Sequence, residues 1–242
     1  MILIRIRIEE AVEEHITKTQ YAFRKSRSTA HAVYIIRRIQ DYAEQKGIAI
    51  NLALLDWQKA FDKVKHNKYS KLQTMYIPPT ITRIVTTLCN KPQFRVSMDG
   101  NTSKWYEQES GIRQGCPLSP YLFLIIMTTL FHDIHSNNGV KTISQRIKGT
   151  DFDEVVYADD TICVAQTAAA MNRLLAAIEE KGAECGLELN KTKCEYLYFG
   201  NKGNIQYKNE HKVPANNEVR YLGCILNNKG DPNRELAKRK QD

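Results

Sequence analysis

The chain has 242 residues, and its 42% hydrophobic and 26% charged content is typical of a folded globular protein and argues against disorder throughout. A formal net charge of +8 suits a polyanion such as nucleic acid, although a merely soluble basic protein fits the charge equally well. Six cysteines without a CxxC pair argue against a zinc site and against a small disulfide scaffold.

The same features predict where the protein works. Scattered cysteines favour reduced thiols, and therefore an intracellular protein of the cytoplasm or nucleus. The apolar run over residues 121–127 is too short to span a bilayer. Arginines interrupt the apolar residues 2–8 and glutamates follow them, which argues against a signal peptide. We therefore expect no membrane partner.

The first quarter of the chain is predicted to be mainly helical. Residues 2–8 alternate apolar and basic side chains, as a strand would, but the glutamate-rich stretch after them favours a helix over the whole start. A polar loop over residues 20–28 precedes an amphipathic helix over 29–46. Residues 48–55 form a nearly continuous apolar run, typical of a buried strand, which ends at Asp56.

Helices and one hairpin are predicted for the middle of the chain. Two alternating segments flank Asp99-Gly100, a pair that favours a tight hairpin turn. Trp105 in this hairpin could stack on a nucleic-acid base, but packing within the hairpin is the simpler interpretation. The helices are expected over residues 60–75 in part, 80–89 and 117–135, and the hairpin strands over 94–98 and 102–109.

Residues 155–164 are the most informative stretch, because Asp159 and Asp160 stand between two apolar, β-branched runs. The pattern predicts a tight hairpin with both acids at its tip. Adjacent like charges repel, so a bound cation is a reason to keep both, and oxygen ligands suit Mg²⁺. The alternative is an ordinary turn that happens to be acidic.

The last third is expected to alternate short strands with one long helix. No repeat and no flexible linker is present, and helices and strands are interspersed, which favours an α+β fold. The predicted elements are a helix over 168–185, strands over 187–189 and 194–199, an outward polar loop over 201–217, a strand over 219–226 and a charged tail over 227–242.

Asp56 stands where the acidic pair would need a partner. Two neighbouring strands could bring Asp56 against Asp159 and Asp160. Three converging carboxylates suit a pair of divalent ions, the arrangement that catalyses phosphoryl transfer. No histidine or thiol accompanies them in the sequence, which favours Mg²⁺ over zinc. A glycine-rich loop ending in Gly-Lys-Ser/Thr is also missing, which argues against a standard NTPase.

Six sequence blocks follow one another along the chain: QYAFRKSRST at residues 20–29, LLDWQKAFD at 54–62, GIRQGCPLSP at 111–120, YADD at 157–160, GLELNKTK at 186–193 and YLG at 221–223. In this order they resemble the fingers motif and motifs A, B, C, D and E of the reverse transcriptase domain of non-LTR (LINE-type) retrotransposons. The resemblance implies a right-hand polymerase palm, an antiparallel sheet with helices on one face, with partial fingers and no thumb.

The resemblance also implies a catalytic role for individual residues. Asp56 and Asp159 would hold two Mg²⁺ ions directly, with Mn²⁺ as a substitute, and Asp160 would support the site or share an ion. Lys193 matches the motif D lysine that protonates the leaving pyrophosphate, and the nearby Lys191 stays open as an alternative.

Nucleotide and nucleic-acid contacts follow in the same way. The backbone around Trp57 to Ala60 would face the triphosphate, and Phe61 would block a ribose 2′-OH. Gln114 would hydrogen-bond near the incoming nucleotide or the template base. Gly115 would let the backbone approach closely. Simple core packing is the alternative for Phe61. Template and primer contacts are implied for Arg24, Lys25, Arg27, Tyr221, Leu222 and Gly223.

The blocks divide the chain into expected parts. These are residues 1–50 as partial fingers, 51–77 as palm with motif A, 78–110 as a connection that carries the hairpin, 111–217 as palm with motifs B to D, and 218–242 as the start of motif E and the junction to a thumb. A missing fingers segment upstream and a missing thumb downstream predict a piece of a larger protein.

Three functions are compatible with these residues. The first is an RNA-directed DNA polymerase, a nucleotidyltransferase that uses an RNA template, a DNA primer and dNTPs. The second is a catalytically inactive remnant that binds nucleic acid. The third, an Mg²⁺-dependent nuclease, leaves motif B and Phe61 unexplained. The intact acids favour the first, and the missing parts favour the second.

Overall fold

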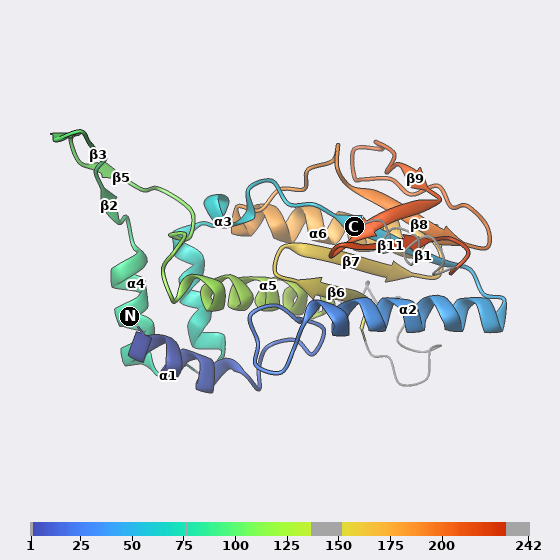
Figure 1. Ribbon diagram of the computed structural model, residues 1–242, viewed down its shortest axis with the longest axis horizontal. Coiled ribbons are helices and arrows are strands. Elements are labelled where there is room, and N and C mark those ends of the chain that lie inside the picture. The colour runs from blue at the N-terminus through green and yellow to red at the C-terminus, as the bar shows by residue number, and fades with distance from the viewer. Residues whose placement is uncertain (1, 76, 137–151, 231–242) are drawn as a thin grey trace.

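The computed structural model describes residues 2–75, 77–136 and 152–230, and a five-stranded sheet forms its centre (Figure 1). The strand order is β6-β7-β1-β8-β9, which places the apolar strand β1 in the middle, and every pair is antiparallel except β8 with β9. The strands are β1 (Ile50–Leu55), β6 (Glu154–Tyr157), β7 (Asp160–Ala165), β8 (Glu195–Phe199) and β9 (Ala215–Asn216).

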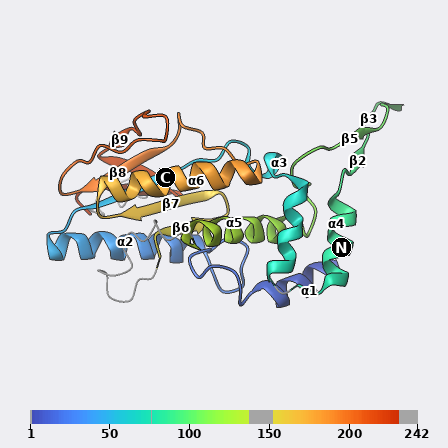
Figure 2. The ribbon, with the colours of Figure 1, turned by 180° about the vertical axis from the view of Figure 1, so that it is seen from behind.

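Two long helices, α5 (Ser119–Ser136) and α6 (Ala168–Cys185), cover one face of the sheet, and α1 (Ile2–Val12) packs beside α5 (Figure 2). Every residue from 121 to 131 is buried, which explains why this part of α5 is apolar all round. The larger hydrophobic core lies here, between the sheet and these helices. The predicted helical start of the chain is confirmed.

The other face is covered as well, by α2 (Thr29–Lys46) and the hairpin of β10 (Glu218–Tyr221) and β11 (Cys224–Asn227). The buried side of α2 repeats at helical spacing through Ile36, Ile39 and Ala43. A smaller core forms between these elements and the sheet. The fold is thus the expected α+β palm, with this second layer in addition.

The remaining elements lie at one end of the molecule (Figure 1). Residues 60–75 are helical in part, as predicted, and the predicted hairpin is present around Asp99-Gly100. The elements are α3 (Ala60–Lys63), the 3₁₀ helix η1 (His66–Met75), α4 (Pro79–Cys89), and the short strand pairs β2 (Gln93–Phe94) with β5 (Tyr106–Glu107) and β3 (Ser97–Met98) with β4 (Asn101–Thr102).

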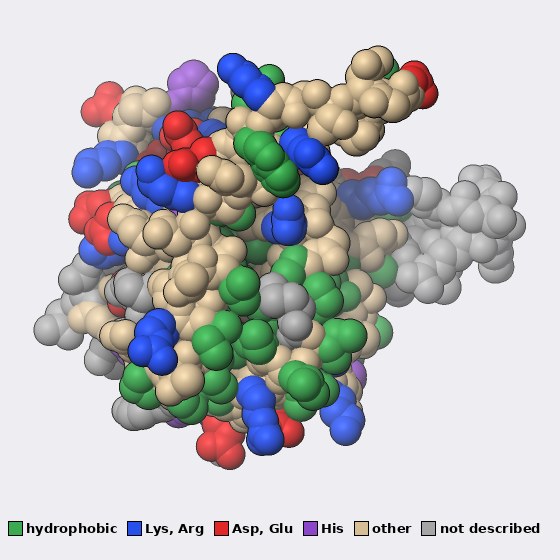
Figure 3. All heavy atoms as spheres, turned by 90° about the vertical axis from the view of Figure 1, so that its left-hand side faces the viewer, with side chains coloured by type: hydrophobic (Ala, Val, Ile, Leu, Met, Phe, Trp, Pro, Cys, Tyr) green, Lys and Arg blue, Asp and Glu red, His purple; other side chains and the backbone are tan. Residues whose placement is uncertain are grey.

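Hydrophobic side chains gather on the surface at this end, over α1 and α4 (Figure 3). In α1 only Ile8 and Val12 are buried, and Ile4 packs partly buried against the larger core, whereas Ile2, Leu3 and Ile6 are exposed. The exposed members of this surface are Ile2, Leu3, Ile6, Ile84 and Leu88. None of the described helices is both long and apolar enough to cross a bilayer.

Three predictions for the last third are wrong. Residues 187–189 form no strand, because only Leu189 makes a β-bridge, to Trp57. Residues 201–217 do not loop outward, since Ile205, Tyr207 and Val213 are buried in the larger core and β9 joins the sheet.

The third correction concerns the expected strand over residues 219–226, which is instead the tight β10–β11 hairpin. Leu222 and Gly223 both have positive φ angles, which reverse the chain between Tyr221 and its partner Cys224. The predicted charged tail lies outside the described residues from 231 onward.

Candidate active site

The predicted convergence of three acids occurs at one edge of the sheet. Strand β1 ends at Leu55, which pairs with Thr161 of β7, so Asp56 and Asp160 are the next residues along the same antiparallel pair. Asp160 in turn pairs with Tyr157 across the β6–β7 hairpin. Asp159 therefore stands in the two-residue turn and Asp160 on the first position of β7. The prediction that both acids occupy the tip of the hairpin is thus correct only for Asp159, because Asp160 already belongs to the strand.

The three carboxylates influence one another. Desolvation raises the pKa of Asp160, and the negative charges of Asp159 and Asp56 raise it further. No Lys or Arg of the described residues forms an ion pair with any of the three. A cluster of carboxylates without a cation is the donor set that fits a hard divalent ion.

The described ranges contain no group of three His, Cys, Asp or Glu side chains already arranged as a metal site. The backbone register, rather than closed ligand geometry, is thus what brings the acids to one edge.

A buried glutamine supports the Ala158-Asp159 turn, a role that no pattern in the sequence predicted. Gln20 is buried, and its side-chain oxygen Oε1 accepts hydrogen bonds from the N–H of Ala22 at 2.9 Å and of Ala158 at 3.1 Å. Backbone bonds between residues 19–21 and Val156 join the same segment to β6. Ala158 has a φ angle of +57°, so the turn needs such support.

Phe61 and Gln114 meet at a hollow of about 460 Å³ beside the start of α5. The Phe61 ring stacks on Phe123 with centroids 4.3 Å apart, and Phe61 is only partly buried. The Gln114 amide donates to the Asp62 carboxylate over 3.2 Å. Gly115, exposed with a φ angle of +81°, also lines the hollow, with nothing within 4 Å of the place a Cβ would occupy.

Close backbone contact joins motifs A and B. The N–H of Gly111 donates to Val64 O over 2.7 Å, and the N–H of Ile112 donates to Phe61 O over 2.6 Å. A Cβ on Gly111 would stand 2.6 Å from Asp62 O, so only glycine fits there. This contact fixes Phe61 and Gln114 relative to each other.

Comparison with known proteins decides the family. A family model described as reverse transcriptase (RNA-dependent DNA polymerase) matches residues 3–226. The chain belongs to this reverse transcriptase family. The match confirms the expected resemblance to non-LTR retrotransposon polymerases, because the curated relatives include polymerases of such elements.

Two of these relatives show how much of such a protein the chain covers. It is 25% identical over 225 residues to the Pol polyprotein of the type-1 retrotransposable element R2 of Nasonia vitripennis, covering 87% of this chain and 22% of that protein. It is also 25% identical to the RNA-directed DNA polymerase from mobile element jockey of Drosophila funebris, covering 93% and 25% respectively. The chain thus spans about a quarter of the length of these relatives.

Solved structures give the same fold. Telomerase from Candida tropicalis, in complex with a fragment of telomeric RNA, superposes with a TM-score of 0.67 at 10% identity, over 94% of this chain and 36% of that chain. A truncated apo form gives a TM-score of 0.64 at 12% identity, over 95% and 43%. At these identities the likeness shows the fold alone.

In this member of the reverse transcriptase family, Trp57 is a buried anchor. Its indole Nε1 donates to Thr161 Oγ1 over 3.4 Å, which ties motif A to motif C. Because the ring is buried, only the backbone of Trp57 is left for the contact that the sequence predicts. The next N–H, of Gln58, already donates to Glu188 O over 2.8 Å.

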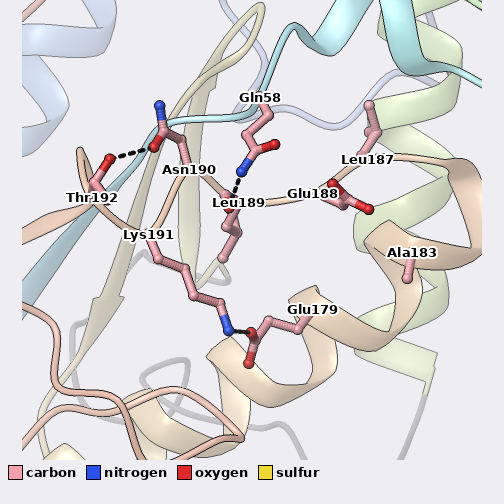
Figure 4. A pocket seen from close by; sticks show the side chains of 9 residues that line it. All are labelled: Gln58, Glu179, Ala183, Leu187, Glu188, Leu189, Asn190, Lys191 and Thr192. Carbon is pink, nitrogen blue, oxygen red and sulfur yellow. Dashed lines mark hydrogen bonds and ion pairs between the residues drawn. The ribbon is translucent and has the colours of Figure 1, made fainter.

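The two candidate lysines of motif D differ in their contacts. Lys191 pairs with Glu179 at 2.5 Å (Figure 4) and lies over the Tyr207 ring, on the wall of a pocket of about 410 Å³. Lys193 is exposed and forms no ion pair with a described residue. Because β8 pairs Glu195 with Leu54, Lys193 lies near the end of β1 that carries Asp56. This arrangement favours Lys193 over Lys191.

The basic residues of the fingers motif do not behave alike. The Arg24 guanidinium is buried and donates to the Glu13 carboxylate over 2.7 Å and to the carbonyls of Thr17 and Gln20. We therefore assign Arg24 to holding this loop rather than to template contact. Lys25 is exposed, and Arg27 lies over the Tyr21 ring at the partly exposed surface.

Tyr221 of motif E lies close to the acids, although on the other face of the sheet from α5. It is buried, and burial raises the pKa of its phenol, with the charge of Asp160 and neighbouring Tyr21 adding to the effect. Its hydroxyl has no hydrogen-bond partner in the described structure. Leu222 and Gly223 form the turn beside it, and Gly223 is exposed.

Proposed function

We propose that this chain carries the polymerase core of an RNA-directed DNA polymerase, which adds a dNTP to a primer 3′-OH along an RNA template. One observation carries the proposal: the β1–β7 register sets Asp56 beside Asp160, next to Asp159, within a chain of the reverse transcriptase family. Three carboxylates at one point suit nucleotidyl transfer and have no evident role in folding.

Asp56 and Asp159 would hold the divalent ions, and Asp160 would complete or support the site. Members of this family use divalent metals, and the all-oxygen donor set favours Mg²⁺, with Mn²⁺ as a substitute. Two bound ions would supply charge neutralisation for the attacking and leaving oxygens. The fit rests on the unpaired carboxylates and on the raised pKa of Asp160.

The chain's own residues would position the substrates. Phe61, partly exposed at the hollow it shares with Gln114, would exclude a ribose 2′-OH by steric contact. Gln114 would contact the incoming nucleotide with its amide, and Gly115 beside it leaves space for the approach. Lys193 would donate a proton to the departing pyrophosphate.

Nucleic acid would lie along both sides of this site. Lys25 and Arg27 would contact the RNA template, and the turn at Leu222 and Gly223 would support the DNA primer end, with Tyr221 holding that turn in place. All six cysteines are free thiols, which supports an intracellular setting in the cytoplasm or nucleus.

A primer-extension assay with the 242-residue chain tests the proposal. Extension of a DNA primer on an RNA template should require Mg²⁺, and Asp159→Asn should lower its rate by about a thousandfold or more, because a metal ligand loses its charge. Asp99→Asn is the matched control: it removes the acid from the other hairpin turn and should extend at the wild-type rate.

RNA binding without extension by the wild-type chain would reject the polymerase in favour of the binding remnant. RNA degradation that depends on Asp159 would favour the nuclease.

A further inference from the structure

The hairpin between α4 and motif B projects from the body as a two-stranded ribbon, here called the arm (residues 93–107; Figures 1 and 2). No helix or sheet of the described residues packs on either of its faces, and all its strand residues are exposed. Trp105 is 59% exposed, so the expected packing of its ring inside the hairpin is wrong. The other exposed large apolar side chains of the arm are Phe94, Val96, Met98 and Tyr106.

Two ring clusters of the arm each include a cation. Phe94 pairs with Tyr106 across the strands, with ring centroids 5.9 Å apart, and Lys104 Nζ lies 5.4 Å from the Tyr106 centroid. The Arg95 guanidinium lies 5.0 Å from the Trp105 centroid. Neither Arg95 nor Lys104 forms an ion pair with a described residue. Their charges are therefore free to meet an anion.

Flat exposed rings beside unpaired cations suit single-stranded nucleic acid. A base stacks on the open side of a ring whatever its sequence, and the neighbouring cation meets a phosphate. A protein partner would instead bury the apolar tip, where Met98 is the most exposed of the arm's large apolar side chains at 71%. The rings and cations lie nearer the base of the arm than Met98 does. Single-stranded nucleic acid and a protein partner should therefore depend on different residues of the arm.

The base of the arm adjoins the proposed polymerase site. A β-bridge joins Ser110 to Lys65, and Gly111 contacts the backbone of Asp62, one residue beyond Phe61. A strand held on the arm would thus lie close to the hollow that Phe61 shares with Gln114. We infer that the arm is a binding surface for single-stranded RNA, with Trp105 and Tyr106 as stacking platforms. The inference deepens the proposed function, because the strand it would hold is the template.

Binding of a fluorescently labelled 20-residue oligouridylate tests this surface. The chain has two tryptophans, and Trp57 is buried whereas Trp105 is exposed, so stacking on Trp105 should quench tryptophan emission. Trp105→Phe should abolish the quenching but keep the affinity within about twofold, because a ring remains. Trp105→Ala should weaken binding roughly fivefold or more. Arg95→Gln should lower the slope of log affinity against log salt by about one unit.

Met98→Ala, on the same arm but without a ring or a cation, is the matched control and should bind as the wild type does. Wild-type affinity in Trp105→Ala, or no binding of the oligomer by any variant, would overturn the inference. An equal loss in Met98→Ala and Trp105→Ala would overturn it in favour of a general apolar surface for protein.

Primer extension with the same proteins separates this inference from the proposed function. Extension by the wild type together with unchanged RNA affinity in Trp105→Ala rejects the arm alone. RNA binding that depends on Trp105 without any extension rejects the polymerase alone.

Discussion

Two hairpins of this chain share a local design and differ in everything around it. The β6–β7 hairpin, here called the catalytic hairpin after its proposed role, turns through Ala158-Asp159, and the arm turns through Asp99-Gly100. Both turns begin with a residue at positive φ, +57° at Ala158 and +50° at Asp99. Yet the strands of the catalytic hairpin are buried in the sheet, whereas those of the arm are exposed on both faces.

The difference shows that the local sequence forms a hairpin, whereas its surroundings decide which of its residues can bind a ligand. Alternating side chains and a tight turn are sufficient to form both. The apolar residues of β6 and β7 are buried in the core, so only the acids at the edge of the sheet are available for the proposed metal binding. On the arm nothing covers the apolar residues, so the rings themselves are available for binding. Three experiments test whether this division is real.

The largest expected effect is on global stability. Ile162→Ala in β7 removes a fully buried side chain between β1 and β6, and should lower the free energy of unfolding by about 2–5 kcal/mol. Val96→Ala, the corresponding truncation on the arm, removes a side chain that is already in solvent and should change it by less than about 0.5 kcal/mol. Urea denaturation followed by circular dichroism measures both. A comparable loss of unfolding free energy in the two variants would mean that Val96 is packed against another part of the protein.

A smaller effect is expected where the catalytic turn rests on Gln20. Gln20→Met keeps the size of the side chain but leaves the N–H groups of Ala22 and Ala158 without their acceptor, at a cost of roughly 1–3 kcal/mol. Because Ala158 precedes Asp159, the primer-extension rate should fall about tenfold or more at saturating dNTP while the KM for dNTP changes little.

Gln20→Glu retains an acceptor oxygen and should recover part of the lost rate. If the rate loss in Gln20→Met is fully explained by a larger unfolded fraction of the protein, Gln20 has a purely structural role.

The core elements were predictable because their patterns are strong. The apolar stretch within α5, the apolar run of β1 and the acids of motif C each carry a period or a turn signal that packing then reinforces. The apolar strand that ends at Asp56 also predicted that Asp56 could lie against Asp159 and Asp160, and the β1–β7 pairing agrees.

The errors lie where local pattern and tertiary environment diverge. Leu187 and Leu189 alternate like a strand, yet the Leu187 N–H bonds back to Gly182 of α6 and only Leu189 makes a β-bridge, to Trp57. The polar composition of residues 201–217 concealed three apolar anchors that reach the core. Nothing in the sequence separates Arg24, bound to Glu13, from the exposed Lys25, because partners that distant leave no periodic signal.

The smallest expected effect concerns one ion pair beside each hairpin. At the start of β6, His135 of α5 bonds to the buried Glu154 carboxylate over 2.8 Å, with Asp153 at 4.0 Å and the Thr19 hydroxyl also on Glu154. At the base of the arm, Lys91 pairs with Glu107 on the surface. The hydrogen bond to Glu154 raises the pKa of His135, against the opposing effect of burial.

A raised folded-state pKa fixes the sign of the pH dependence. The contribution of His135 to stability is complete below its unfolded pKa of about 6.5 and is lost as the pH rises through the higher folded value. The stability difference between wild type and His135→Gln should therefore shrink from pH 6 upward. Glu107→Gln should show no such trend, because Lys91 keeps its charge throughout this range and exposed pairs contribute little. Thermal unfolding of the three proteins between pH 5.5 and 8.5 measures the trend, and a difference that grows with pH would contradict this role for His135.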